Sequence, residues 1–172
     1  MVTLIPHRAA IQTRQSSAEW DARAGTIAVE RVRVSEILAV ARLQRRCFRR
    51  SLAYRPTTLL MLYLWPRARF LVARAGTEVV GCVIGDVHGG QSRVISICVD
   101  PDWRRRAIGT QLLTEIERRL PEGNMILMVE AGNIGAQQMY RDCGYLPVGE
   151  SRDYYGRGRN GIWMQKTRPP RT

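Results

Sequence analysis

The sequence has almost no lysine and very little histidine. Lys166 is its only lysine, so the other 26 of its 27 basic residues are arginines, and its two histidines are His7 and His88. Two isolated histidines do not make a zinc site, and no nucleophile turn accompanies His88 for Ser/His/Asp chemistry. We therefore expect no metal centre and no serine hydrolase site.

Long apolar runs and paired cysteine motifs are also missing. The longest apolar run, residues 59–65, falls well short of the ~18 residues of a membrane span. The cysteines Cys47, Cys82, Cys98 and Cys143 include no Cys-x-x-Cys pair, which predicts free thiols in a reducing, cytoplasmic compartment. The chain has 172 residues, 45% of them hydrophobic, which suits a single globular domain with a real core.

One predicted helix lacks carboxylates where helices usually carry them. Residues 94–99 predict a strand, and the helical spacing of apolar residues over 108–120 predicts an amphipathic helix after it. The turn between them holds Arg104, Arg105 and Arg106, although a cation at a helix N-terminus costs roughly 0.3–1 kcal/mol when exposed. Gly109 costs about 1 kcal/mol against alanine inside a helix. Both features are explained if an anion binds the free N–H groups of residues 105–110.

The same stretch resembles a known cofactor-binding segment. Arg104-x-x-Ala107-x-Gly109 resembles the Gln/Arg-x-x-Gly-x-Gly/Ala segment with which the GNAT N-acetyltransferase superfamily binds acetyl-coenzyme A, although Ala107 departs from the usual glycine. The resemblance implies an acetyl-CoA-dependent acyltransferase with an oxyanion donor near Val99, and a pantetheine arm that pairs with the fourth strand where it separates from the fifth. The implied cofactor-binding residues here are Ile97, Cys98, Val99, Arg104, Arg105, Arg106, Ala107, Ile108, Gly109 and Thr110.

A second segment adds to this resemblance. Asn133-x-x-Ala136-x-x-Met139-Tyr140-x-x-x-Gly144-Tyr145 resembles the family's Asn-x-x-Ala-x-x-Leu-Tyr-x-x-x-Gly-Phe segment. The resemblance implies that Asn133, Ala136 and Tyr140 contact the cofactor, and that the hydroxyl of Tyr140 is the general acid. Taken alone, a tyrosine on a short helix is more often a packing residue.

The group that removes a proton from the attacking amine is less clear from the sequence. Glu130, near the end of the predicted fifth strand, is the candidate base, and Asp86, His88 and Asp100 are weaker candidates. For each of them a solvated or capping role is the simpler interpretation. A chain without an obvious strong base favours protein α-amines, whose pKa is about 7.7–8 against about 10.4 for lysine.

The acceptor side points the same way. Residues 151–164, with Tyr154 and Tyr155, resemble the Tyr-Tyr-x-x-Gly-x-Asp-Ala segment of the RimI-like branch, which acetylates protein N-termini, including those of ribosomal proteins. The resemblance implies that both tyrosines contact the acceptor, and we expect Tyr54, in the loop of residues 49–55, on the opposite wall. Arg159 and Asn160 stand where that branch carries an acidic pair, so the preferred acceptor sequence stays open.

Two other functions remain open. One is a small-molecule amine acetyltransferase of the same fold. The other is a non-catalytic basic module that binds RNA or the ribosome, which the net charge of +12 would suit. The expected partners are therefore an amine acceptor and, for a protein substrate, the ribosome, with neither a membrane nor a specific nucleic acid.

The expected fold is α/β with a mixed sheet. Strand and helix signals follow the order βααβββαβαββ over residues 26–167, which is the GNAT order, and the sheet is expected to splay between its fourth and fifth strands. Residues 1–25 predict a flexible extension, and residues 168–172 a short tail. We expect Thr57 or Thr58 to cap the second helix and Asn160-Gly161 to form a two-residue turn in the last hairpin.

Overall fold

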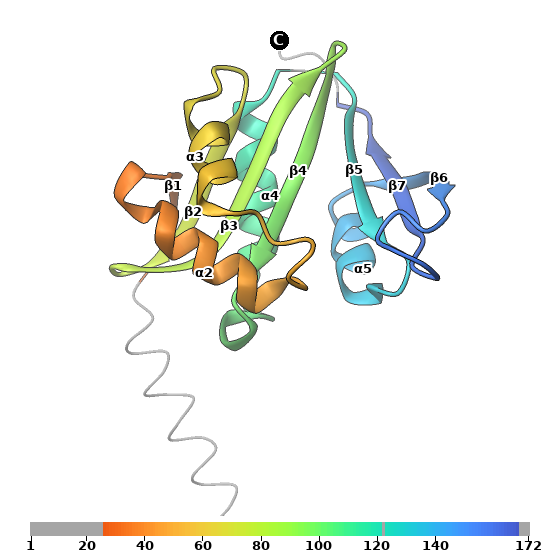
Figure 1. Ribbon diagram of the computed structural model, residues 1–172. Helices are drawn as coiled ribbons and strands as arrows, with labels where there is room; N and C mark the ends of the chain where they lie inside the picture. The colour runs from red at the N-terminus through yellow and green to blue at the C-terminus, as the bar shows by residue number, and fades with distance from the viewer. Residues whose placement is uncertain (1–25, 122, 169–172) are drawn as a thin grey trace, which may run out of the picture.

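The computed structural model describes residues 26–121 and 123–168, which form a mixed sheet with helices on both faces (Figure 1). The predicted extension, residues 1–25, lies outside the described residues. The strands are β1 (Ile27–Arg31), β2 (Arg69–Ala75), β3 (Glu78–His88), β4 (Gln91–Val99), β5 (Met125–Glu130), β6 (Leu146–Ser151) and β7 (Gly161–Lys166). The α-helices are α2 (Ile37–Cys47), α3 (Pro56–Leu64), α4 (Ile108–Arg119) and α5 (Ile134–Asp142), with 3-10 turns η1 (Val34–Glu36) and η2 (Pro101–Trp103). The predicted order βααβββαβαββ is confirmed.

The seven-stranded sheet has the order β1-β2-β3-β4-β5-β7-β6 and contains one parallel pair, β4 with β5. That pair is short, since only residues 92–94 of β4 align with residues 125–127 of β5. Beyond these residues the two strands diverge (Figure 1), which confirms the expected splay. The second half of β4 therefore has a ladder partner on its β3 side alone within the described part of the chain.

The helices divide the core into two parts. α2 and α3 cover one face of the sheet, whereas α4 and α5 cover the other (Figure 1). Two glycines of β3 allow α4 to approach closely: a Cβ at Gly81 would lie 2.9 Å from Leu112 Cδ1, and one at Gly85 would lie 2.8 Å from Leu120 Cδ1. Real Cβ atoms do not approach this closely. Only glycine at these two positions therefore lets α4 and its C-cap residue pack against β3 at this distance. No helix among residues 26–121 and 123–168 is long and apolar enough to cross a membrane.

Three local expectations are corrected by the structure. α3 starts at Pro56, with Arg55 as its N-cap residue, so Thr57 and Thr58 lie inside the helix; proline fits the first helical position because its missing N–H is not needed there. Asn160-Gly161 is not a two-residue turn, since residues 152–160 form a longer loop between β6 and β7. Arg168, placed in the tail, donates to the carbonyls of Gly123 (3.1 Å), Glu117 and Pro121 and is part of the domain.

Candidate active site

The loop before α4 has an unusual backbone. Ala107, the N-cap residue of α4, has φ 56° and ψ 8°, and Arg105 has φ 59°. A residue with a Cβ adopts this left-handed conformation at a cost of order 1 kcal/mol or more. The first intrahelical bond joins Gln111 N–H to the Ala107 carbonyl at 3.0 Å, and no side chain caps the helix. The amides at the start of α4 therefore lack intrahelical acceptors, which is a backbone arrangement suited to an anion.

The arginines of this loop are anchored on the protein itself. Arg104 Nε donates to the carbonyl oxygen of Val99 at 3.3 Å, and the guanidinium carbon of Arg106 lies 5.0 Å from the centre of the buried Trp103 ring. Their positive charge still lies at the positive end of the α4 dipole. The loop consequently presents both amide donors and a positive potential where the sequence predicts phosphate binding.

Gly109 has a packing role that sequence reasoning missed. A Cβ on Gly109 would lie 2.8 Å from Met139 Sδ and 3.9 Å from Val99 Cγ2. The glycine thus allows α5 to pack against the first turn of α4, next to the end of β4. The sequence explained this glycine only by the approach of a ligand, whereas the structure adds contact between two helices.

The free edge of β4 faces the splay. Asp100 N–H donates to the Val80 carbonyl at 2.8 Å, and Gly81 lies opposite Val99 in the β3–β4 ladder. Because hydrogen bonds in an antiparallel ladder alternate along the strand, the backbone N–H and C=O of Val99 and Ile97 point away from β3. Ile97 and the N–H of Val99 therefore present strand-like backbone groups to the splay beside the start of α4, whereas the Val99 carbonyl already accepts from Arg104 Nε and Cys47 Sγ.

Tyr140 lies at this junction. Its side chain belongs to the core between α5 and the sheet, is 5% exposed and packs on Tyr145 with 6.0 Å between ring centres. Its hydroxyl forms no hydrogen bond with another described residue, and no buried side-chain oxygen in that part of the chain lacks a partner. The oxygen therefore reaches solvent, while burial of the ring raises the pKa of Tyr140 above its ordinary value.

Asn133, the other polar residue predicted on α5, serves the helix. Its Oδ1 accepts the N–H of Ala136 at 3.1 Å, so it caps α5 as helix propensities predict. Its own N–H donates to the Glu130 carbonyl at 2.9 Å. Asn133 and the half-buried Ala136 therefore fix how α5 leaves β5, and through it where Tyr140 lies.

The candidate bases are paired with arginines or exposed. Both Glu130 oxygens accept from Arg159 at 2.6 Å, and these bonds lower the pKa of Glu130. Asp86 accepts two bonds from Arg93. The buried Asp100 pairs with Arg46 at 2.7 Å and caps η2, whereas His88 is exposed at the end of β3. The ion pair with Arg159 favours the charged form of Glu130 and makes this carboxylate a weaker proton acceptor.

The three tyrosines assigned to the acceptor come together from two loops. Tyr154 and Tyr155 lie in the β6–β7 loop with 5.0 Å between ring centres, and the Tyr155 hydroxyl donates to the Met128 carbonyl at 3.0 Å. Tyr54 lies in the α2–α3 loop, where its pKa is raised by burial and by the nearby Tyr154. The two loops therefore face one another across the diverging strands.

Two further residues of this region were not predicted. Gln44, fully buried on α2, accepts the N–H of Tyr54 through Oε1 at 2.9 Å and donates to Ser96 Oγ at 3.3 Å. It ties the acceptor loop to β4. Arg93 pairs with Asp86 and interacts electrostatically with Tyr54 and Tyr154. A polar residue on the inner face of an amphipathic helix was the only sequence signal for Gln44, and Arg93 gave none.

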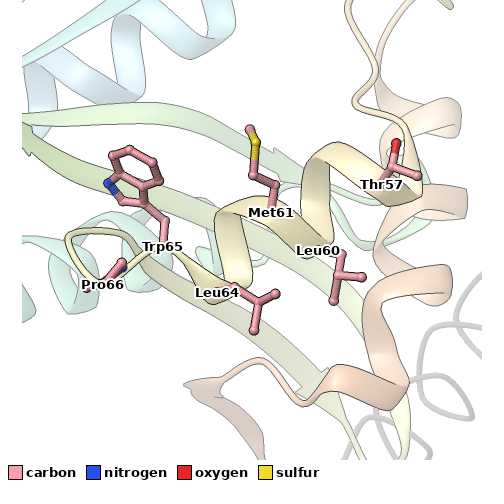
Figure 2. Close-up of a pocket in the computed structure, with 6 residues that line it drawn as sticks. All are labelled: Thr57, Leu60, Met61, Leu64, Trp65 and Pro66. Atoms are coloured by element: carbon pink, nitrogen blue, oxygen red, sulfur yellow. The ribbon is translucent and has the colours of Figure 1, made fainter.

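A separate pocket of about 430 Å³ lies on α3. Figure 2 shows its lining, in which the Thr57 hydroxyl and the Trp65 indole N–H are the polar side-chain groups beside Leu60, Met61, Leu64 and Pro66. No predicted site residue lines it, so it is apart from the junction described above. In the described part of the chain, no three His, Cys, Asp or Glu residues are grouped to hold a metal ion.

Comparison with known proteins identifies the family. The acetyltransferase (GNAT) family model matches residues 37–145. The chain belongs to the GNAT acetyltransferase family. An uncharacterized N-acetyltransferase of Methanocaldococcus jannaschii is 30% identical over 137 residues, covering 76% of this chain and 85% of that protein.

Other GNAT proteins agree in sequence or in fold. The N-alpha-acetyltransferase RimI of Mycobacterium tuberculosis is 33% identical over 94 residues, covering 52% of this chain and 60% of RimI. Arabidopsis thaliana NAA60, solved in complex with acetyl-CoA, is 15% identical with a TM-score of 0.71, covering 83% of this chain and 98% of that chain. The chain is therefore an acetyltransferase with the GNAT fold, and its relatives include RimI.

Proposed function

We propose that this acetyltransferase transfers the acetyl group of acetyl-CoA to the N-terminal α-amine of a protein. The observation that carries the proposal is the junction at the splay. There, the uncapped start of α4, the unpaired edge of β4 and the Tyr140 hydroxyl are neighbours, and the tyrosines of two loops face one another across the same opening.

The residues at the junction fit acetyl-CoA. The amides of Ile108, Gly109 and Thr110 at the positive end of α4 suit its pyrophosphate, with the charge of Arg104 to Arg106 around them. The backbone of Ile97 and Val99 suits the amide groups of its pantetheine arm. When bound, the cofactor supplies the acetyl group as a thioester.

Tyr140 acts as a hydrogen-bond donor to the departing sulfur. Burial keeps its pKa above about 10, whereas that of a free thiol is about 8.5. Complete proton transfer to a thiolate would be uphill by at least about 2 kcal/mol, at 1.36 kcal/mol per unit. The phenol therefore keeps most of its proton while it stabilises the developing negative charge.

The acceptor amine must arrive largely deprotonated. Glu130, Asp86 and Asp100 are paired with arginines, so a strong base is missing among the candidates that the sequence provides. Freeing a lysine amine at neutral pH costs about 3.5 kcal/mol more than freeing an α-amine. This difference favours an α-amine, held between Tyr54 on one side and Tyr154 and Tyr155 on the other. Glu130 as a base that acts through water remains a prediction.

A peptide-library assay tests the proposed acceptor. The purified chain is incubated with acetyl-CoA and peptides of varied N-terminal sequence, each also prepared with a blocked N-terminus and one internal lysine, and products are read by mass spectrometry. We expect acetylation of free N-termini and at least about tenfold less of lysine, given the pKa difference. Transfer to polyamines, amino acids or aminoglycosides but not to peptides would establish the small-molecule alternative. Salt-sensitive RNA binding without transfer would establish the non-catalytic one.

A further inference from the structure

Three of the four cysteines meet beside the candidate site. Cys82 and Cys98 lie opposite each other in the β3–β4 ladder, with 3.5 Å between their sulfurs. Cys47, the last residue of α2, donates its S–H to the carbonyl of Val99, the residue that follows Cys98, at 3.3 Å. Cys143 lies apart, after the end of α5. The cluster thus runs from the half-buried Cys47 inward to two buried thiols.

The thiols of this cluster are not equivalent. The neighbouring Cys98 thiol, together with the nearby guanidinium of Arg104, lowers the pKa of Cys47 despite its partial burial. The neighbouring thiols of Cys47 and Cys82, together with burial, raise the pKa of Cys98, which is 7% exposed. Reactive cysteines are accessible thiols of lowered pKa, and those that act as redox sensors have a second thiol next to them. Cys47 has both properties.

We propose that Cys47 is a site of oxidation by hydrogen peroxide, and that Cys98 converts the product to a disulfide. The Cys47 thiolate attacks one peroxide oxygen, which breaks the O–O bond and gives Cys47 sulfenic acid and hydroxide. The Cys98 sulfur then attacks the Cys47 sulfur, the S–O bond breaks, and the hydroxyl group leaves as water with the Cys98 proton. Peroxide is thereby reduced and two thiols are oxidised to one disulfide.

The disulfide would act on the free edge of β4. It removes the bond from Cys47 to the Val99 carbonyl and links the end of α2 covalently to the residue next to Val99. If Ile97 to Val99 bind the cofactor, as the proposed function requires, oxidation lowers the affinity for coenzyme A and reduction restores it. That consequence rests on the proposed function, whereas the oxidation of Cys47 does not.

The experiment uses the full chain, reduced and then titrated with hydrogen peroxide. Peptide mapping under non-reducing conditions follows the disulfide, and dimedone traps sulfenic acid. We expect Cys47 to be oxidised at least about tenfold faster than Cys143, since the pKa of Cys143 is raised by burial and the thiolate is the reactive form. The product should be a Cys47–Cys98 disulfide, and Cys98→Ser should leave dimedone-labelled Cys47.

Matched variants separate the possible outcomes. Cys143→Ser should oxidise as the parent does, whereas Cys47→Ser should lose the disulfide and keep Cys98 reduced at the same peroxide dose. Oxidation of Cys143 as fast as Cys47, or a Cys82–Cys98 disulfide formed at the parent rate in Cys47→Ser, would overturn the proposal. Should Cys98→Ser fail to fold, Cys47→Ser alone still decides it. A Cys47–Cys98 disulfide that leaves coenzyme A affinity unchanged would count against the cofactor site on β4 and not against the oxidation.

Discussion

Two helices begin at the splay, and they differ in how their N-termini are capped. α5 starts with Asn133, whose side chain accepts the N–H of Ala136, so part of its first turn is satisfied from within. α4 starts with Ala107 in a left-handed conformation, without a side-chain cap. The two helices touch where Met139 packs against Gly109. The first turn of α5 therefore has a side-chain cap for one of its amides, whereas that of α4 has none.

The difference indicates a division of labour. An uncapped helix start surrounded by arginines is costly unless an anion binds there, so in the proposed function α4 serves the cofactor with its backbone. The cap of α5 instead fixes the helix that carries Tyr140, the side chain that we propose takes part in the reaction. If this comparison holds, the same substitution should have different effects at the two N-termini.

The largest expected effect comes from a glutamate in each first turn. Gly109→Glu brings a negative charge to the amides of α4, and two like charges about 4 Å apart repel by about 4 kcal/mol near a protein surface. We expect at least a ~100-fold loss of coenzyme A affinity, measured by calorimetry. Gly135→Glu, in the first turn of α5 where a Cβ meets nothing within 4 Å, should keep the parent affinity.

A further variant separates charge from packing at Gly109. Gly109→Ala adds the methyl group that approaches Met139 but no charge, so it should cost some stability and only a small part of the affinity. Equal losses of affinity in the alanine and glutamate variants would mean that the helix contact, and not an anion site, explains the glycine.

The next effect concerns the side chain that α5 supplies. Tyr140→Phe removes the hydroxyl and little surface, so the affinity for coenzyme A should be nearly unchanged. We expect kcat to fall about 100-fold, because this is the usual effect of removing one preorganised hydrogen-bond donor to a developing anion. Tyr145→Phe is the matched control, because Tyr145 packs on the ring of Tyr140. This variant loses the hydrogen bond to Glu117 and should change stability more than turnover. Full turnover by Tyr140→Phe would remove the phenol from the mechanism.

The two helix starts also show how far the sequence leads. Asn133 and Gly144 are residue types that favour the start and the end of a helix, because capping is local and depends on adjacent residues; in the structure Asn133 accepts the capping bond and Gly144 has φ +88°. The order of strands and helices and the splay follow from apolar periodicity and family resemblance. The sequence thus predicted most of the architecture, whereas the anion site before α4 stays a prediction.

The remaining features depend on residues distant in the chain. The pairing of Glu130 with Arg159 joins β5 to a loop about thirty positions later, and no local pattern shows that a candidate base is already engaged. The cysteine cluster and the contact of Gly109 with Met139 likewise require the packed sheet. The long β6–β7 loop was missed because Asn160 bonds Asp153 and Glu150 across it instead of forming a tight turn.

A smaller effect tests the cap of α5. Asn133→Ala should lower the free energy of unfolding by about 1 kcal/mol, as loss of a helix N-cap does, whereas Asn133→Asp retains the acceptor oxygen and should remain close to the parent. Urea denaturation measures both. A loss of coenzyme A affinity in Asn133→Asp at unchanged stability would mean that the side-chain amide contacts the cofactor, as the family resemblance implies, in addition to capping the helix.

The smallest effect is expected at the start of α4, where a substitution should stabilise the protein, whereas Asn133→Ala should destabilise it. Ala107 adopts a left-handed conformation that glycine adopts without a steric penalty, so Ala107→Gly should raise the free energy of unfolding by about 0.5–1 kcal/mol, the relief exceeding the added freedom of the unfolded chain. Ala39→Gly, inside α2, should instead lower it by about 1 kcal/mol. Thermal melts resolve the pair, because 1 kcal/mol moves the midpoint by about 2–4 °C at this chain length. If both substitutions destabilised equally, the left-handed start of α4, and with it the outward presentation of its amides, would have to be abandoned.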